Sequence, residues 1–243
     1  MSYRVLCLTL LCSTAAMAGP SDYVSLPNVE YGEREVDFKF GSARAPAAAT
    51  LGESSLGFGY GVSEWWFTEF YLKYQRESPL GTRFDAIEWE NKFQLTETGK
   101  YPLDVGLLIE FEAPRNRSEG YELRFGPLLQ TEFGRWQWNG NLLLGRVYRS
   151  SDGTAHSTEI GYQWQTKYRW QPQFEWGLQG FGEMGRWNHW DSAAEQNHRL
   201  GPAVFGKLAL GNRQTLRYNA AWLVGVSDAA PDHTFRLQVE YEF

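Results

Sequence analysis

The sequence has very little cysteine and no long apolar run. Its only cysteines, Cys7 and Cys12, both lie within the first 18 residues. If those residues are removed as a leader, the rest of the chain has no thiol that could form a wrong disulfide in an oxidising compartment. No later stretch approaches the roughly 20 apolar residues of a membrane helix. If the remaining chain meets a bilayer, it must do so as a β-barrel.

A strong charge of one sign is also missing. The formal net charge is −6 over 243 residues, and no basic run is suited to nucleic acid. Aromatic residues, by contrast, are abundant at 16%, with eleven tryptophans. We therefore expect no nucleic-acid partner and one ordinary domain or one mid-sized barrel.

The first 18 residues have the pattern of a secretory signal peptide. Arg4 is followed by an apolar run over residues 5–12 and by the small residues Ala16-Met17-Ala18, so cleavage is expected before Gly19. A lipoprotein anchor at Cys12 is the alternative, but Leu11 stands where such a site needs a small residue. The domain prediction is a signal peptide over 1–18 and a barrel over 19–243.

The dominant signal in the remaining chain is alternation with a period of two, which places successive side chains on opposite faces of a strand. In the last segment Phe235, Leu237, Val239, Tyr241 and Phe243 share one face, and Arg236, Gln238, Glu240 and Glu242 share the other. The same pattern predicts twelve strands, over 34–40, 54–62, 65–76, 85–95, 101–112, 121–131, 136–148, 157–170, 174–186, 198–209, 215–226 and 234–243. The predicted fold is all-β, a transmembrane antiparallel up-and-down β-barrel.

The connections between these strands alternate between tight turns and longer loops, which gives the barrel a direction. Short turns belong in the periplasm and longer loops outside, and an even strand count brings both termini to one side. Aromatic girdles are expected near the inner ends at Trp66, Tyr101, Trp136, Trp170, Trp176 and Tyr241, and near the outer ends at Tyr74, Phe111, Tyr121 and Tyr148. A soluble β-sandwich or lipocalin-like barrel would also alternate, but strands of this length and the signal peptide favour the membrane.

Pro127 and Pro202 lack an N–H for the ladder, so a local bulge, or a strand boundary miscounted by a few residues, is expected at each.

In such a barrel the apolar face contacts lipid and the charged face points inward. The candidate lumen-lining residues are Glu69, Lys73, Glu88, Glu90, Lys92, Glu110, Glu122, Arg124, Glu159, Lys167, Arg199, Lys207, Arg217, Arg236 and Glu240. Mixed charge with an excess of acid favours a weakly cation-preferring pore or one for neutral small solutes over a dedicated anion channel.

Whether this lumen is open is left undecided by the strand count, because twelve strands lie between the filled eight-stranded barrels and the water-filled larger porins. Inward glycines such as Gly57, Gly59, Gly61 and Gly106 either widen the lumen or make room for a long side chain from across it. No loop looks long enough to fold in as a substantial plug. This favours a narrow channel over a lumen closed by its own charge network.

No catalytic, cofactor-binding or metal-binding residue is expected. The histidines His156, His189, His198 and His233 fall at the predicted outer rim near several aspartates. Such groups can bind a divalent metal, and His156 with Ser157 could form part of a catalytic site that hydrolyses lipid. However, polar residues ordinarily collect in loops, and none of the spacings matches a known ligand pattern.

Three stretches near the end of the chain resemble a known group of proteins: residues 200–206, residues 225–232, and Glu240-Tyr241-Glu242-Phe243. They resemble uncharacterised proteobacterial outer-membrane proteins, which are similar in turn to the meta-pathway phenol-degradation, or transporter-like, barrel family. The resemblance implies a barrel and uptake of small organic compounds. It carries over no catalytic or binding residue.

The function that these observations favour is an outer-membrane channel for diffusion of small solutes, exported through the periplasm of a Gram-negative cell. A closed barrel with a structural or interaction role is the alternative, followed by a surface lipid-modifying enzyme. The expected partners are outer-membrane lipid and lipopolysaccharide, the outer-membrane assembly machinery and periplasmic chaperones, together with a solute that the sequence does not identify.

Overall fold

The computed structural model describes residues 19–44, 50–77, 81–151 and 156–243, so the expected signal peptide over 1–18 lies outside the described residues. These residues form long antiparallel strands, with one short 3-10 helix, η1, at Arg117–Glu119. The barrel strands are β1 (Arg34–Arg44), β2 (Leu51–Ser63), β3 (Trp66–Glu77), β4 (Gly81–Gln94), β5 (Asp104–Pro114), β6 (Tyr121–Phe133), β7 (Trp136–Tyr148), β8 (Glu159–Gln171), β9 (Phe174–Arg186), β11 (Asn197–Gly211), β12 (Gln214–Gly225) and β13 (His233–Glu242).

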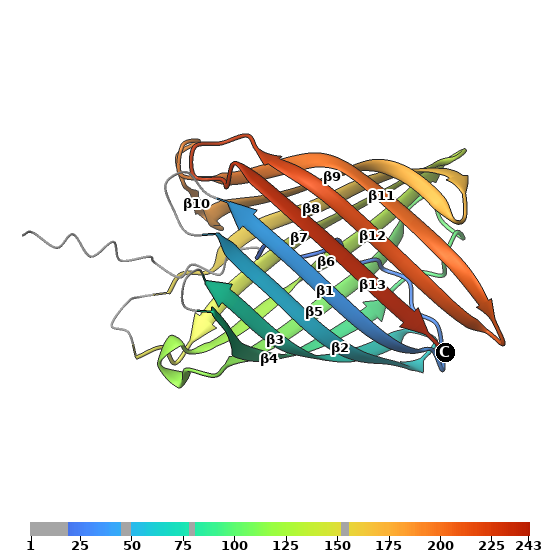
Figure 1. The fold of residues 1–243 in the computed structure, drawn as a ribbon, viewed down its shortest axis with the longest axis horizontal. Coiled ribbons are helices and arrows are strands. Elements are labelled where there is room, and N and C mark those ends of the chain that lie inside the picture. The colour runs from blue at the N-terminus through green and yellow to red at the C-terminus, as the bar shows by residue number, and fades with distance from the viewer. Residues whose placement is uncertain (1–18, 45–49, 78–80, 152–155) are drawn as a thin grey trace, which may run out of the picture.

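The strands close into a barrel in which each strand pairs with its neighbours in the chain (Figure 1). The closing seam joins the first strand to the last, with Phe38 opposite Val239 and Asp37 opposite Glu240. A further short strand, β10 (His189–Trp190), pairs only with the end of β9 and belongs to the connection between β9 and β11. The prediction of a closed twelve-stranded antiparallel barrel is confirmed.

Side chains on these strands alternate between an exposed apolar face and a buried polar face. On β13, Phe235 is 48% exposed, whereas the neighbouring Arg236 is 2% exposed. Exposed aromatic side chains recur around the outside, including Phe58, Trp89 and Trp222. A water-soluble protein would bury such an extensive apolar belt, so this outer surface is built to contact lipid.

The two ends of the barrel differ as expected. Four connections at the end that carries the C-terminus are tight turns, at 64–65, 134–135, 172–173 and 212–213 (Figure 1), and the fifth, 95–103, is longer. The connections 115–120, 187–196 and 226–232 lie at the other end. We call these the inner and the outer end. No helix in the described parts of the chain is long and apolar enough to cross a membrane.

Two local expectations were wrong. The strand expected from residue 101 begins at Asp104, because residues 98–103 form a turn that leaves Tyr101 outside β5. At Pro127 and Pro202 the register shows no bulge. Instead the ladder to one neighbour is interrupted and resumes in the same register, between β6 and β7 and between β11 and β12. The missing proline N–H therefore costs hydrogen bonds without shifting the strand.

Placing a charge on the outer face tests this orientation of the barrel. Phe70 lies near the middle of β3, is exposed, and stacks on Trp89 with ring centroids 5.8 Å apart. We expect Phe70→Arg to lower the free energy of unfolding by about 2–4 kcal/mol, the cost of an arginine at the bilayer midplane. Refolding into lipid vesicles measures it. Glu97→Arg, in an inner turn, is the control and should change little.

Candidate functional site

The lumen holds a stretch of the chain itself. Residues 19–33, here called the N-terminal segment, precede β1 and run inside the barrel from its outer end to its inner end (Figure 1). At the outer end the Ser21 hydroxyl donates to the Glu53 carboxylate at 3.1 Å. Gly41 of β1 lies so close to the backbone of Pro20 that a Cβ there would overlap it. A glycine in the wall thus makes room for the segment.

The middle of the segment carries its larger side chains into the charged interior. The Tyr23 hydroxyl donates to Glu90 at 2.7 Å, and the Lys39 ammonium lies 3.4 Å from the centre of the Tyr23 ring. Asp22 lies 3.5 Å from Arg124. These contacts join the segment to three separate strands.

Val24, Ser25 and the residues that follow continue toward the inner end. Val24 packs in an apolar cluster with Phe181, Ala203, Phe205, Ala221 and Leu223. The Ser25 carbonyl accepts a bond from the Asn141 amide at 3.1 Å, and the Val29 N–H donates to the Gln94 side chain at 2.8 Å. The segment is therefore fixed along its length mainly by polar contacts.

The segment turns back into β1 at Gly32, whose φ of +78° suits glycine. The Gly32 N–H donates to the Gly61 carbonyl at 2.9 Å, and the Gly61 N–H donates to the Glu33 carbonyl at 2.9 Å. A Cβ on Gly61 would overlap the Glu30 carbonyl, and one on Gly106 would lie 2.9 Å from Pro27. Gly61 and Gly106 therefore accommodate backbone, whereas Gly57 and Gly59 make room for side chains of Glu69, Tyr71, Phe67 and Glu35.

The sequence favoured an open lumen because no loop looked long enough to plug it. In the described chain the lumen is instead filled in part by residues that lie before the first strand. They have no period-two pattern, so strand searching passes over them. Gly61 of β2 and Gly106 of β5 were the available signal, but from the sequence alone their space was assigned to a wider lumen or to side chains from across it, and not to backbone.

The segment divides the remaining space. A cavity of about 620 Å³ lies in the inner half of the barrel and reaches Tyr23 and Val24. Two much smaller cavities, of about 40 and 20 Å³, reach Asp22 from the outer side. Residues 22–24 therefore form the layer that separates the large inner cavity from the outer half.

The predicted lumen residues of β3 to β6 come together in one acidic wall. Glu69, Glu90 and Glu110 are direct neighbours across β3, β4 and β5, and Glu88, Glu112 and Glu122 are neighbours across β4, β5 and β6. The Lys73 ammonium bonds Glu88 at 2.9 Å and also Glu112, and Arg124 lies 3.4 Å from Glu110 and 3.6 Å from Glu122. Lys92 has no ion pair in the described chain but lies over the Phe67 ring at 4.4 Å. Glutamates outnumber the bases in this wall.

The adjoining wall, β6 to β9, is built largely from amides, which were not singled out from the sequence. Gln130, Gln137, Asn139, Gln165 and Gln179 form a chain of side-chain hydrogen bonds of 2.8–3.1 Å across β6 to β9. An amide both donates and accepts, so such a ladder can be satisfied without net charge. The interior is thus rich in charge along β3 to β6 and rich in neutral amides along β6 to β9.

At the inner end the remaining candidates form ion pairs. Lys167 lies 3.2 Å from Glu175, and Lys207 lies 3.8 Å from Glu242. Arg217 pairs with both Glu240 and Glu242. Lys207 and Arg217 are the most exposed of these side chains, so they lie at the rim of the barrel.

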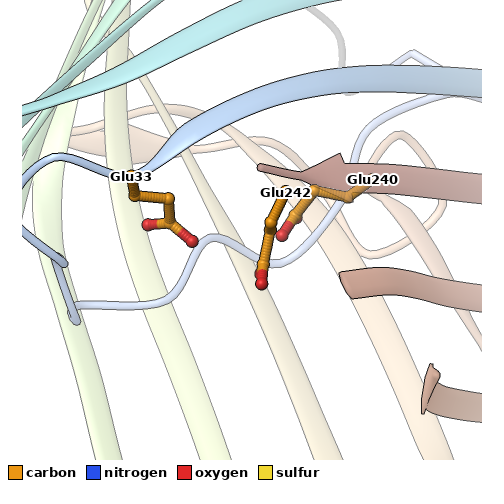
Figure 2. A group of neighbouring side chains, drawn as sticks. All are labelled: Glu33, Glu240 and Glu242. Carbon is orange, nitrogen blue, oxygen red and sulfur yellow. The ribbon is translucent and has the colours of Figure 1, made fainter. Parts of the chain in front are cut away.

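Three carboxylates, those of Glu33, Glu240 and Glu242, lie together at this inner end (Figure 2). Burial raises the pKa of Glu33, and the Glu242 carboxylate raises it further, while Lys92 and Arg217 oppose the shift. The oxygens are close enough to hold a cation, as are those of Glu88, Glu90 and Glu110. Arg217 contacts Glu240 and Glu242 of the first cluster, and Lys73 and Arg124 contact Glu88 and Glu110 of the second. Two of the three carboxylates in each cluster are thus already in ion pairs.

Glu159, Arg199 and Arg236 complete the predicted set. Glu159 is half-buried in the outer half, and Arg199 is buried with its guanidinium 3.9 Å from Glu183. Arg236 is buried deep inside, where Nε and Nη1 have no hydrogen-bond acceptor among the described residues, and its guanidinium lies 4.7 Å from the centre of the Phe181 ring. A buried arginine without a carboxylate is energetically costly.

The histidines lie at the outer end, as expected, but they are not brought together. His198 bonds the Tyr162 hydroxyl at 2.9 Å and the Gln196 side chain at 2.7 Å, and His233 lies edge-on to Trp222. Neither of the possible metal-holding groups in the described chain contains a histidine. Asp152, which we expected near them, lies outside the described residues.

Comparison with known proteins gives a likeness of fold. No family model matches the chain, and no curated protein matches its sequence. Among solved structures, the COG4313 outer membrane channel from Pseudomonas putida F1 is similar with a TM-score of 0.60 and 15% identity over 91% of this chain and 98% of that one. The NanC porin has a TM-score of 0.54 and 12% identity, over 86% of this chain and 98% of that one.

The translocator domain of the autotransporter NalP from Neisseria meningitidis is also similar, with a TM-score of 0.53 and 12% identity over 90% of this chain and 91% of that domain. At these identities the likeness extends to the fold and not to a solute or a mechanism. The chain therefore has the closed β-barrel fold that is shared by outer-membrane channels, a porin and an autotransporter translocator.

Proposed function

We propose that the protein is an outer-membrane channel for small solutes, closed in this structure by its N-terminal segment and opened when that segment withdraws. The apolar outer belt and the fold support the outer membrane as its location. The observation that carries the proposal is that residues 22–24 separate a cavity of about 620 Å³ from the outer half of the lumen. We infer that withdrawal of this layer joins the two halves of the lumen.

The way the segment is held supports its removal. Ser21, Asp22, Tyr23 and Val29 are fixed by hydrogen bonds or an ion pair that water can replace. Val24 is the one segment residue in the buried apolar cluster of the described chain. Withdrawal would also give water access to Arg236, whose Nε and Nη1 have no acceptor among the described residues while the segment is in place.

The charge of the lumen points to the solute class. The acidic wall of β3 to β6 attracts cations, and the amide wall offers paired donors and acceptors to neutral polar groups. We therefore propose passage of cations or neutral polar solutes rather than anions. The resemblance to the phenol-degradation family adds small organic compounds, for which the apolar cluster around Phe181 and Phe205 supplies a limited surface.

A closed barrel with a structural or interaction role is the second candidate. The ion pairs of Lys73 and Arg124 and the inserted segment together favour it. In both cases we propose that the chain contacts lipopolysaccharide with its outer belt, and that the assembly machinery recognises its C-terminal aromatic Phe243.

Removing the segment should open the channel. We expect deletion of residues 20–30 from the mature chain to turn rare, small current steps into frequent and several-fold larger ones, because the separating layer is gone. Single-channel recording of the refolded protein in a planar bilayer measures this. Equal conductance with and without the segment would refute gating by the segment, and no current from either form would favour the closed barrel.

Fixing the segment in place is the matched experiment. The Asn28 amide donates to the Thr98 hydroxyl at 3.2 Å, and the chain after residue 18 has no natural cysteine. We expect the Asn28→Cys/Thr98→Cys disulfide to abolish the current, and a reducing agent to restore the wild-type trace. Each single cysteine variant serves as the control and should conduct like the wild type.

The acidic wall should set the ion preference of the opened channel. In the form lacking residues 20–30, Glu88→Gln together with Glu110→Gln should move the reversal potential in a salt gradient toward zero, because two interior charges are lost. Glu97→Gln, in an exposed inner turn, is the control. An anion-preferring reversal potential before any glutamate is changed would contradict our interpretation of the lumen.

A further inference from the structure

We propose that Glu53 is the binding site for the α-ammonium group of the processed chain, which begins at Gly19. The inference rests on cleavage before Gly19 and goes beyond the channel function. It assigns a role to a carboxylate at the outer end of the lumen that neither the acidic wall nor the ion pairs account for. The ligand is a primary ammonium group that belongs to this same chain.

The geometry at Gly19 carries the proposal. The Glu53 carboxylate lies against the Cα of Gly19, so closely that a Cβ at this position would overlap it. The backbone nitrogen of Gly19 is bonded to the same Cα and is therefore within reach of the carboxylate. The first residues also fold around it, because the Asp22 N–H donates to the Gly19 carbonyl at 3.2 Å and the Ser21 hydroxyl donates to Glu53 at 3.1 Å.

Glu53 lacks a cation among the side chains that the structure describes. It makes no ion pair there, and its hydrogen-bonded side-chain partner is the neutral Ser21. Lys73, whose positive charge acts on Glu53, is already bonded to Glu88 and Glu112. A half-buried carboxylate without a counter-charge is unfavourable, and an α-ammonium at Gly19 would supply that charge with three donors.

Cleavage changes the group that faces Glu53. Hydrolysis of the Ala18–Gly19 peptide bond takes up one water and leaves a carboxylate on Ala18 and an α-ammonium on Gly19. Before cleavage this nitrogen is a neutral amide with one N–H. After cleavage it is a cation, so the end of the segment gains its ion pair only in the processed chain.

The reactivity of the α-amine tests the pairing. The protein is purified from outer membranes, its first residue is read by intact mass, and its α-amine is acylated with an N-hydroxysuccinimide acetate at pH 7. We expect the intact mass to show a chain that begins at Gly19. In Glu53→Gln we expect the α-amine to be acylated about fivefold faster than in the wild type, which is the factor that roughly 1 kcal/mol of charge pairing gives. Glu97→Gln is the matched control and should label at the wild-type rate.

Two further variants keep the test decisive if Glu53→Gln does not fold, which heat-modifiable gel mobility would reveal. Gly19→Ala should label faster than wild type, because its methyl group displaces the carboxylate, whereas Ser21→Ala removes only the neutral donor and should label nearly as slowly as wild type. A mature chain that begins elsewhere, or Glu53→Gln and Gly19→Ala rates equal to wild type, would overturn the proposal. The readout involves no current, so it is independent of the channel function.

Discussion

The closing of β1 against β13 is the constraint on which the rest of this structure depends. In lipid no water satisfies an open strand edge, so the sheet must return to itself. Closure fixes which face of each strand contacts lipid, and through the register it sets the residues that meet inside. It also encloses more space than the inward side chains of twelve strands fill, and the N-terminal segment occupies part of that space.

The interior therefore combines two kinds of packing. Around Val24 it resembles a small apolar core, and along β3 to β6 it is a dense set of glutamates neutralised in part by Lys73 and Arg124. Both kinds of packing hold the N-terminal segment. The apolar contact of Val24 fixes where the segment lies along the lumen. Its polar contacts are hydrogen bonds that water could also make, so they hold the segment without burying a large apolar surface.

Much of the barrel could be predicted from the sequence, because period-two alternation is a local property. Placing Phe235 outward also places Arg236 inward, and every neighbouring strand follows from the register. The N-terminal segment could not be found in this way, since its conformation is set largely by contacts with β4, β6 and β7, which are distant in sequence. The sequence also did not identify Tyr71 and Phe67 as lumen residues. Aromatic side chains occur on both faces of β3, so aromatic character alone does not separate the lipid face from the lumen face.

The direction of the N-terminal segment has a consequence for assembly. Gly19 lies at the outer end, while Gly32, at the inner end, leads directly into the strand that forms the seam. If strands enter the membrane from the side of the inner end, two routes are open to this segment. Either residues 19–33 lie in the lumen before β1 pairs with β13, or their free end passes lengthwise through the closed barrel. In the first route the last strand to pair encloses the first described residues, so the position of a residue in the sequence also sets when it must be in place.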